Sequence, residues 1–464
     1  MTVAAELRRV LRPEQVRTAP ADLAAVARDG SHLIGAPEIV AYPESTADVS
    51  AIVRIACAAG MPVVARGGGT SLAASTVPQR GGIVIATNRM RAILELDAIE
   101  RTALVQPGLA NAALDLAARA VALRYVPDPS SRSVATIGGN VGTNAGGLHC
   151  LGHGVTGDHV LGLEVVLSSG EICWLDDQSV PDLRALVLGS EGQLAIVTAA
   201  LCRLLPIAER TGMVVAAFSS LAETGRAAER LVLETPGLVA CEFIDRHMLE
   251  ALAESSPGSL PADAHAVLII EVEALVEGID AALESVRRCV QEAGGTTEVR
   301  LAADAQATVW AARRHAAAAL GRLYPDSYTH DFATPRDRIV ETLQASAVIA
   351  QQHGLVLSSV AHLGDGNLHP RLHYDATDPG AFQRALDASE ELFELILENG
   401  GTLTGEHGIG LEKLGALGRQ YGESELDAMR AIRLAFDPTG TLNPGKTLPD
   451  PGLDATKGMY AAIA

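Results

Sequence analysis

Glycine-rich turns that separate short apolar runs are the feature that most restricts how this chain can fold. From Val40 to about Ile207 the two alternate, as in VVARGGGTSL, GGIVIAT, ALVQPG, ATIGGNVGTNAGG, LGLEVVLSSG and GQLAIVT. Short apolar runs bounded by glycine are typical of strands. Residues 49–60 and 110–122 lie between them and have apolar side chains three and four apart, which predicts helices. The first part of the chain is therefore expected to mix strands with helices.

After Pro206 the pattern changes to longer units. The strand-like runs 214–218 and 267–272 are each followed by a helical stretch. The stretch after the second run places five apolar residues on one helix face, namely Val276, Ile279, Leu283, Val286 and Val290. This pattern indicates a second domain that contains βαβ units, and a last helix is expected over 426–436.

Length, charge and cysteine usage narrow the class of protein. At 464 residues the chain is too long for one ordinary core and should form two or three domains. A formal net charge of -20 argues against nucleic-acid or anionic-membrane partners. The six cysteines show no CxxC spacing, which predicts reduced thiols and no iron–sulfur cluster. Neither a signal peptide nor a transmembrane segment is evident, so a cytoplasmic protein is expected.

The run from His362 to His369 combines a turn signal with two imidazoles. Asp365 and Gly366 are a favoured pair for a two-residue type I′ hairpin turn, and with them at the tip His362 falls directly opposite His369. Directly opposed residues point to one face, so both imidazoles can bind one divalent ion. Glu406, in the later run Gly-Glu-His-Gly, could supply a third ligand. The alternative is a hairpin that carries two surface histidines.

A second motif, Arg66 to Ser71, follows the strand expected at 63–65. Its three glycines let the backbone approach an anion with several N–H groups, which suits a pyrophosphate, although a tight structural turn is the alternative. The dinucleotide fingerprint GxGxxG fails because Leu72 stands where the third glycine belongs, so a nicotinamide site is not indicated. The Walker A letters at 440–447 lack a preceding strand and a following helix, so ATP binding is not expected.

Six motifs in this order resemble one family. They are ARGGGTSL, DPSSRSVATIGGNVGTNAGG, LGSEGQLAIVT, AHLGDGNLHP, GEHGIGLEK and DPTGTLNPGK, and together they span about residues 35–446. The family is that of the FAD-linked 2-hydroxy-acid dehydrogenases, with D-lactate dehydrogenases, the flavin subunit of glycolate oxidase and D-2-hydroxyglutarate dehydrogenase among its members. The resemblance implies an α+β protein of the vanillyl-alcohol-oxidase type. It would have a PCMH-type FAD-binding domain at 1–208 with its core at about 35–208, a ferredoxin-like antiparallel-sheet cap domain at 209–405 that carries the metal-binding hairpin, and a C-terminal helical segment at 406–464 that returns to the flavin.

The resemblance also implies roles for residues of this chain. The FAD pyrophosphate would lie in the loop of Arg66, Gly67, Gly68, Gly69, Thr70 and Ser71. The flavin would be lined by Pro129, Ser130, Thr136, Gly139, Asn140, Asn144, Gly147, Glu191, Gly192, Ile196 and Asn443. A divalent metal, Zn²⁺ ahead of Mn²⁺ or Fe²⁺, would be bound by His362, His369 and Glu406. No histidine or cysteine lies in the loop 66–76, so the FAD is expected to be noncovalent.

Further residues would act on the substrate. His407 would be the base, and Arg313 would hold a substrate carboxylate. A helix-surface charge is the alternative for Arg313, because Arg314 beside it is equally available. By strand alternation Arg371 shares a face with His369, and it is either a second carboxylate clamp or the partner of a neighbouring acid.

Two departures from the family pattern bear on the cofactor and the substrate. Residues 73–76 are Ala-Ala-Ser-Thr where relatives often have glycines, so the phosphate loop is expected to differ in shape. Thr329 stands where the hydroxyglutarate enzymes have a lysine, two residues before Asp331. This departure weakens hydroxyglutarate as the substrate.

The implied reaction is the metal-assisted oxidation of a D-2-hydroxy acid to the 2-keto acid, with a hydride passing from Cα to flavin N5. D-Lactate or glycolate is the first expectation, and D-2-hydroxyglutarate or another dicarboxylic hydroxy acid is the alternative. The electrons would then leave to a quinone, a cytochrome, an electron-transfer flavoprotein or a partner subunit, and a homodimer is compatible with the sequence. Two rivals stay open: a metallohydrolase, which would be colourless, and a noncatalytic flavin subunit that relays electrons in a complex.

Overall fold

A computed structural model of the chain describes residues 2–449, so the last part of the expected C-terminal segment, residues 450–464, lies outside the described residues. The chain divides into two compact units. Unit 1 contains the chain up to Gly147, Gly154–Ile207 and the chain from Glu406 onward. Unit 2 contains Leu148–His153 and Ala208–Gly405. Among residues 2–449 we find no helix with both the length and the apolarity that a membrane span requires.

The first sheet of unit 1 is mostly parallel. Its strand order is β1 (Val16–Arg17), β2 (Ile39–Ala41), β4 (Ile83–Ala86) and β3 (Val63–Arg66), and only β1 is antiparallel to its neighbour. Helices α1 (Val3–Val10) and α3 (Thr46–Ala58) contribute to the same core. Ser45 starts α3 as its N-cap, because its hydroxyl accepts a hydrogen bond from the Asp48 N–H at 3.1 Å.

The second sheet of unit 1 is antiparallel throughout. It runs in the order β5 (Ile93–Asp97), β6 (Thr102–Val105), β10 (Ile196–Arg203), β8 (Val160–Val166) and β9 (Ile172–Asp176). Helices α4 (Asn111–Arg119) and α5 (Ile137–Thr143) share its core. Smaller elements complete the unit, namely α2 (Pro20–Ala24), β7 (Leu123–Arg124), α7 (Leu183–Val187), β11 (Leu205–Pro206), α14 (Leu417–Gln420) and α15 (Glu423–Phe436). The helices expected over 49–60, 110–122 and 426–436 are confirmed.

Unit 2 is built on one antiparallel sheet of eight strands. Its order is β15 (Thr296–Arg300), β12 (Arg210–Phe218), β14 (Ala266–Ala274), β13 (Leu238–Asp245), β18 (Val356–His362), β19 (Asn367–Tyr374) and β16 (Asp326–Thr329), and β17 (Phe332–Ala333) also pairs with β19. Strands β12 and β13 flank β14, which is antiparallel to both, so the expected βαβ unit occurs in split form. The ferredoxin-like antiparallel sheet implied by the resemblance is confirmed.

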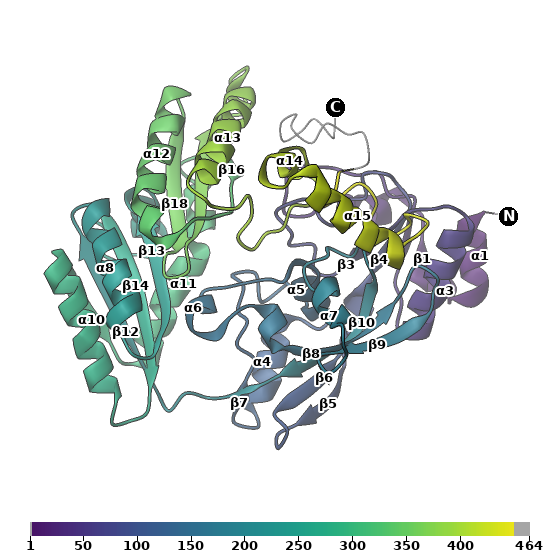
Figure 1. Ribbon diagram of the computed structural model, residues 1–464, viewed down its shortest axis with the longest axis horizontal. Coiled ribbons are helices and arrows are strands. Elements are labelled where there is room, and N and C mark those ends of the chain that lie inside the picture. The colour runs from purple at the N-terminus through teal and green to yellow at the C-terminus, as the bar shows by residue number, and fades with distance from the viewer. Residues whose placement is uncertain (1, 450–464) are drawn as a thin grey trace. The chain divides into compact units, whose positions relative to one another are not determined.

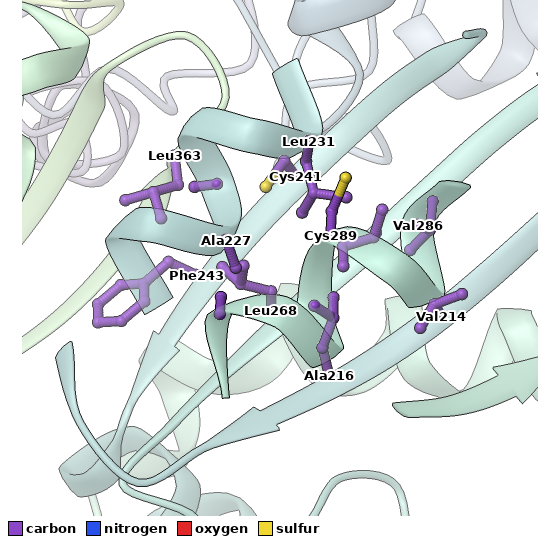
Figure 2. Packing of buried hydrophobic residues seen from close by; sticks show 14 of the residues in the cluster. Val214, Ala216, Ala227, Leu231, Cys241, Phe243, Leu268, Val286, Cys289 and Leu363 are labelled. Carbon is purple, nitrogen blue, oxygen red and sulfur yellow. The ribbon is translucent and has the colours of Figure 1, made fainter. Parts of the chain in front are cut away.

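Helices pack on both faces of this sheet. Helices α8 (Leu221–Glu234) and α10 (Ile279–Ala293) lie side by side on one face, where α12 (Ile339–Gln352) joins them (Figure 1). Figure 2 shows their contact layer, with Ala227 and Leu231 of α8 packed among side chains of β12, β13 and β14. The opposite face packs on α9 (Arg246–Ser255) and α11 (Ala303–Leu320). Unit 2 also contains α6 (Cys150–His153) and α13 (Ala381–Glu398).

The predicted register of the histidine hairpin is wrong. His362 pairs with Asn367, and His369 pairs with Val360, so the connection between the strands has four residues instead of two. The reason lies in the turn: the N–H groups of Asp365 and Gly366 both donate to the carbonyl of His362, at 3.2 and 3.1 Å. A type I′ turn needs positive φ at both central residues, and of these two only Gly366 has it, at 87°. A shift by two positions preserves the face, so both imidazoles still point the same way.

Candidate active site

The histidine pair lies on the sheet face that α9 and α11 cover elsewhere. Glu242 of β13 pairs with His362 of β18, and Val360 pairs with His369 of β19, so these four residues share one face. The two imidazole rings are nearly perpendicular, with centroids 5.1 Å apart. Each ring offers a nitrogen within 4.8 Å of a nitrogen of the other, and both side chains are buried. This spacing fits two ligands of one metal ion.

Glu242, which the sequence reasoning missed, is the carboxylate behind His362. Its Oε1 lies 2.7 Å from His362 Nδ1, and its Oε2 accepts from Arg313 Nε at 3.0 Å and from Nη2 at 2.8 Å. All three side chains are buried. The signal was present in the sequence, because Glu242 is an acid inside the otherwise apolar strand run LVACEFI, and a buried acid needs a cationic or hydrogen-bonding partner.

A second carboxylate, Asp331, lies behind His369. Its Oδ1 is 3.8 Å from His369 Nδ1, and its Oδ2 accepts from the Thr404 hydroxyl at 2.6 Å and from the Gly405 N–H at 2.9 Å. Asp331 therefore fixes the end of unit 2 where the chain leaves it. The next residue is Glu406, the third predicted ligand, and the base candidate His407 follows with Nε2 3.9 Å from Glu406 Oε1.

Arg371 is a partly buried cation on this face, and it has no ion pair among residues 2–449. It pairs with Ser358 and Thr329 in the sheet register, which places it on the same face as His369. Its Nε is buried and has no hydrogen-bond partner among the described residues. Burial lowers the pKa of Arg371 to about 10, and the nearby charge of Arg313 adds to this effect. An anion placed here would relieve both costs.

In unit 1 the predicted phosphate loop packs against the segment that begins α5. A Cβ on Gly67 would lie 2.2 Å from the Thr136 hydroxyl oxygen, and one on Gly68 would lie 2.3 Å from the Val134 carbonyl oxygen. Side chains would therefore force the two segments apart, and glycine is required at both positions. Thr136 is the N-cap of α5 and accepts from the Gly139 N–H at 3.3 Å.

Several other predicted flavin residues have structural partners in unit 1. Asn144 ends α5 in the left-handed conformation and accepts from the Gly157 N–H at 2.7 Å. Gly147 is pressed against the Asp128 backbone, and Pro129 and Ser130 begin the turn closed by the bond from the Arg132 N–H to the Pro129 carbonyl. Gly192 has a φ of 75°, and Ile196 lies in the core of the first sheet. Asn140 differs, because its buried Nδ2 has no partner among the described residues.

Glu191 and Asn443, predicted to line the flavin, form a buried cluster with Lys446. Glu191 Oε1 accepts from the N–H groups of Ile409 at 2.9 Å and Gly410 at 3.1 Å, and Asn443 Nδ2 donates to the Glu191 carbonyl at 2.6 Å. Lys446 donates to the side-chain oxygen of Asn443. Burial raises the pKa of Glu191 and lowers the pKa of Lys446 to about 7. These contacts hold the C-terminal part of the chain within unit 1.

The residues of both units fit the groups expected of them. The glycine loop lies against Thr136 and Val134, and the buried Nδ2 of Asn140, which has no partner among residues 2–449, is a donor that a bound cofactor would satisfy. Two buried imidazoles, one hydrogen-bonded to a carboxylate and the other with a carboxylate oxygen 3.8 Å from its Nδ1, suit a divalent transition metal.

The family comparisons cover most of the chain. Residues 37–176 match the family described as FAD binding domain, and residues 207–447 match FAD linked oxidases, C-terminal domain. Glycolate oxidase subunit GlcD of Escherichia coli is 37% identical over 421 residues, covering 89% of this chain and 84% of that protein. D-2-hydroxyglutarate dehydrogenase of Stutzerimonas stutzeri is 31% identical, covering 95% and 97%. D-lactate dehydrogenase of Archaeoglobus fulgidus is also 31% identical, covering 88% and 91%.

Solved structures agree on the fold. p-Cresol methylhydroxylase with bound substrate superposes with a TM-score of 0.82 at 16% identity, covering 97% of this chain and 96% of that one. 4-Ethylphenol oxidase from Gulosibacter chungangensis gives a TM-score of 0.78 at 20% identity, covering 97% of both chains. The expected flavin fold is thereby confirmed. With both domain matches in the expected order and relatives above 30% identity over most of the chain, this protein belongs to the family of FAD-linked oxidases.

Proposed function

We propose that this protein oxidises a 2-hydroxy acid to the corresponding 2-keto acid, with FAD as the electron acceptor and a divalent metal ion, Zn²⁺ first, at His362, His369 and Glu406. The observation that carries the proposal is the buried imidazole pair of unit 2, which shares its sheet face with the partly buried Arg371, a cation that lacks an ion pair among the described residues. Relatives with this domain pair are named for glycolate, D-lactate and D-2-hydroxyglutarate, which are all 2-hydroxy acids.

Each cofactor supplies chemistry that side chains cannot. FAD, held at Arg66–Ser71 and beside Asn140, supplies two-electron redox capacity. A metal ion at the two histidines and Glu406 supplies a positive charge that stabilises an alkoxide and orients a hydroxy acid. Glu406 is assigned as a ligand because the chain delivers it one residue after Gly405, which Asp331 fixes.

Arg371 is proposed to bind the substrate carboxylate. Its guanidinium lies on the sheet face that holds both histidines, and its Nε is a buried donor without a partner among residues 2–449. A carboxylate can accept two parallel hydrogen bonds from one guanidinium, which would fix the acid in a single orientation. The substrate carboxylate would also neutralise the positive charge of Arg371, which is costly to bury alone.

His407 is proposed as the base that takes the hydroxyl proton. His407 follows Glu406 directly, so a substrate bound to the ion that Glu406 would coordinate would come within reach of the imidazole. A neutral imidazole suits this step, because its ordinary pKa lies near the pH of the cell.

Two observations favour a small monocarboxylic acid, D-lactate or glycolate, over D-2-hydroxyglutarate. The second carboxylate of hydroxyglutarate would need its own cation, and the other buried arginine on this face, Arg313, is already paired with Glu242. Thr329, opposite Arg371 in the register, adds no charge. The E. coli relative is a glycolate oxidase subunit. Its name as a subunit also supports a partner subunit, ahead of a quinone, a cytochrome or an electron-transfer flavoprotein, as the next electron carrier.

An anaerobic titration of the purified protein tests the proposal. The visible flavin spectrum would be recorded during additions of glycolate, D-lactate, D-2-hydroxyglutarate and D-malate, with and without a chelator. We expect one of the monocarboxylic acids to bleach the flavin band, and the chelator to slow the bleaching. A yellow protein that none of the four acids bleaches would favour an electron-relay subunit, and a colourless protein that takes up no FAD would favour a metallohydrolase.

The variant His407→Ala tests the assignment of the base. Turnover should fall by about 10² to 10⁴, the usual contribution of general base catalysis, while the FAD content stays at the wild-type value. His353→Ala is the matched control, because His353 contacts Glu391 at the surface end of α12, outside the site. Undiminished turnover in His407→Ala, or loss of its flavin, would remove the assignment.

A further inference from the structure

Glu242 joins two buried groups through its two oxygens. Oε1 lies 2.7 Å from Nδ1 of the His362 imidazole, and Oε2 takes both contacts from Arg313, at 2.8 and 3.0 Å. Glu242 is 1% exposed and Arg313 is 5% exposed, so water screens neither charge. Three strands and a helix hold the arrangement, because β13 pairs with both β14 and β18, and Arg313 projects from α11.

This geometry selects one tautomer of His362. Oε2 of Glu242 already accepts from the Arg313 guanidinium and its Oε1 faces Nδ1 of His362, so Nδ1 is the ring nitrogen that donates. Nε2 is then the nitrogen with the lone pair, which is the form that binds a metal ion. The carboxylate also fixes the plane of the ring.

We propose that Glu242 is the positioning residue of the metal site, that it presents Nε2 of His362 to the ion, and that Arg313 holds Glu242 in place for this role. The inference rests on the metal ion of the proposed function. Arg313 has this role in addition to the one that the resemblance implied, because its Nε and Nη2 both donate to Glu242.

The size of the effect follows from what such carboxylates contribute elsewhere. Replacing the hydrogen-bonded partner of a metal-binding histidine typically lowers metal affinity about 10- to 100-fold. Glu242→Gln keeps the shape of the side chain, but its amide can donate as well as accept, so the selection of one His362 tautomer is lost. We expect Zn²⁺ affinity to fall within that range while FAD content is unchanged.

The measurement is a competition between the FAD-loaded protein and a chromophoric chelator for Zn²⁺, without substrate. Glu271→Gln is the matched control: Glu271 is a buried acid on the same sheet face, and its carboxylate contacts Trp310 Nε1 at 2.6 Å and His149 Nε2 at 3.6 Å. We expect wild-type affinity from the control.

A second variant keeps the test open if Glu242→Gln fails to fold. Arg313→Lys retains the positive charge but loses the pair of guanidinium N–H groups that hold Glu242 Oε2. In the absence of substrate, Zn²⁺ affinity should therefore fall about 3- to 10-fold. Unchanged affinity in whichever variant folds overturns the inference and leaves the proposed function standing. A wild-type protein that binds no Zn²⁺ overturns both the inference and the metal part of the proposed function.

Discussion

His373 is a buried ionisable side chain on the strand that carries His369. It lies on β19 two residues beyond Arg371, with Nε2 2.7 Å from the Ser358 hydroxyl and its ring stacked on Tyr324 at 4.3 Å. Burial lowers the pKa of His373 to about 4, and the charges of Arg371 and His247 act in the same direction. The folded protein therefore holds this imidazole neutral at pH values where an unfolded chain would protonate it.

The consequence is an acid-sensitive contribution to stability. An unfolded histidine titrates near pH 6.5, so the contribution is complete above that pH and is lost as the pH falls toward 4, by about 2 to 3 kcal/mol. His373→Gln cannot titrate, so its unfolding free energy should change less over this range than that of the wild type. Urea unfolding followed by Trp310 fluorescence measures this free energy at each pH. Both proteins would carry Trp174→Phe, because the chain has two tryptophans and only Trp310 should report. Equal pH slopes for the two proteins would contradict the assignment.

Among the elements, the turn between β18 and β19 depends most on one residue. Gly366 has a φ of 87°, and a Cβ there would lie 2.3 Å from the Thr334 carbonyl oxygen. Thr334 is held close to the turn, because its N–H donates to the Gly366 carbonyl at 3.0 Å. Both the backbone conformation and the lack of space therefore require glycine.

Gly366→Ala should lower the unfolding free energy of unit 2 by more than the cost of placing alanine at positive φ, because its Cβ also clashes with Thr334. Gly354→Ala is the control, because Gly354 also has positive φ, at 67°, but a Cβ there meets no atom within 4 Å. The control should cost about 1 to 2 kcal/mol for the left-handed conformation, and Gly366→Ala about 1 to 3 kcal/mol more for the clash. Urea midpoints read from Trp310 compare them. Equal losses would show that the turn shifts freely.

The hairpin also shows how far the sequence predicts the site. Alternation along the strands was enough to place His362, His369 and Arg371 on one face, because that face survives a shift of two positions. The turn type was not predictable, because it depends on where Thr334 and the His362 carbonyl lie. Glu242 is distant in sequence from His362, and only the pairing of β13 with β18 brings the two together. Local patterns therefore predicted the elements and faces, and missed contacts set by strand order.

On the scale of the whole molecule, the chain forms two units with separate cores and enters unit 2 twice. Leu148–His153 belongs to unit 2 although the chain on both sides of it belongs to unit 1. Within unit 2, a Cβ on Gly152 would lie 2.7 Å from the Val239 Cα, so α6 approaches β13 closely. No local pattern in the sequence indicates this excursion, because six residues are too few to show a period.

Because the two units have separate cores, we expect bound FAD to stabilise unit 1 and not unit 2. FAD would be added to the FAD-free protein at a concentration about 100 times the Kd of FAD. Amide exchange that requires global opening of unit 1 should then become about 100-fold slower. The protected segments should include residues 66–71 and 134–140. Amides of β14 in unit 2 should be unaffected. Hydrogen exchange read by mass spectrometry measures both, and Gly68→Ala, which would push Val134 away, should lose the protection. Protection confined to unit 2 would refute the assigned FAD site.

One strand edge in unit 1 has a consequence for biosynthesis. The outer strand β3 receives its second neighbour from the far end of the chain: the Val63 N–H donates to the Thr441 carbonyl at 2.9 Å, and the Asn443 N–H donates to the Val63 carbonyl at 2.7 Å. Residue 443 follows residue 63 by about 380 positions, which a ribosome takes roughly 20 to 75 s to translate. Throughout that interval the nascent chain carries an open strand edge able to pair with other chains. A stop codon placed before residue 441 would make this exposure permanent, so such truncated products should aggregate or be degraded even though most of the protein has been made.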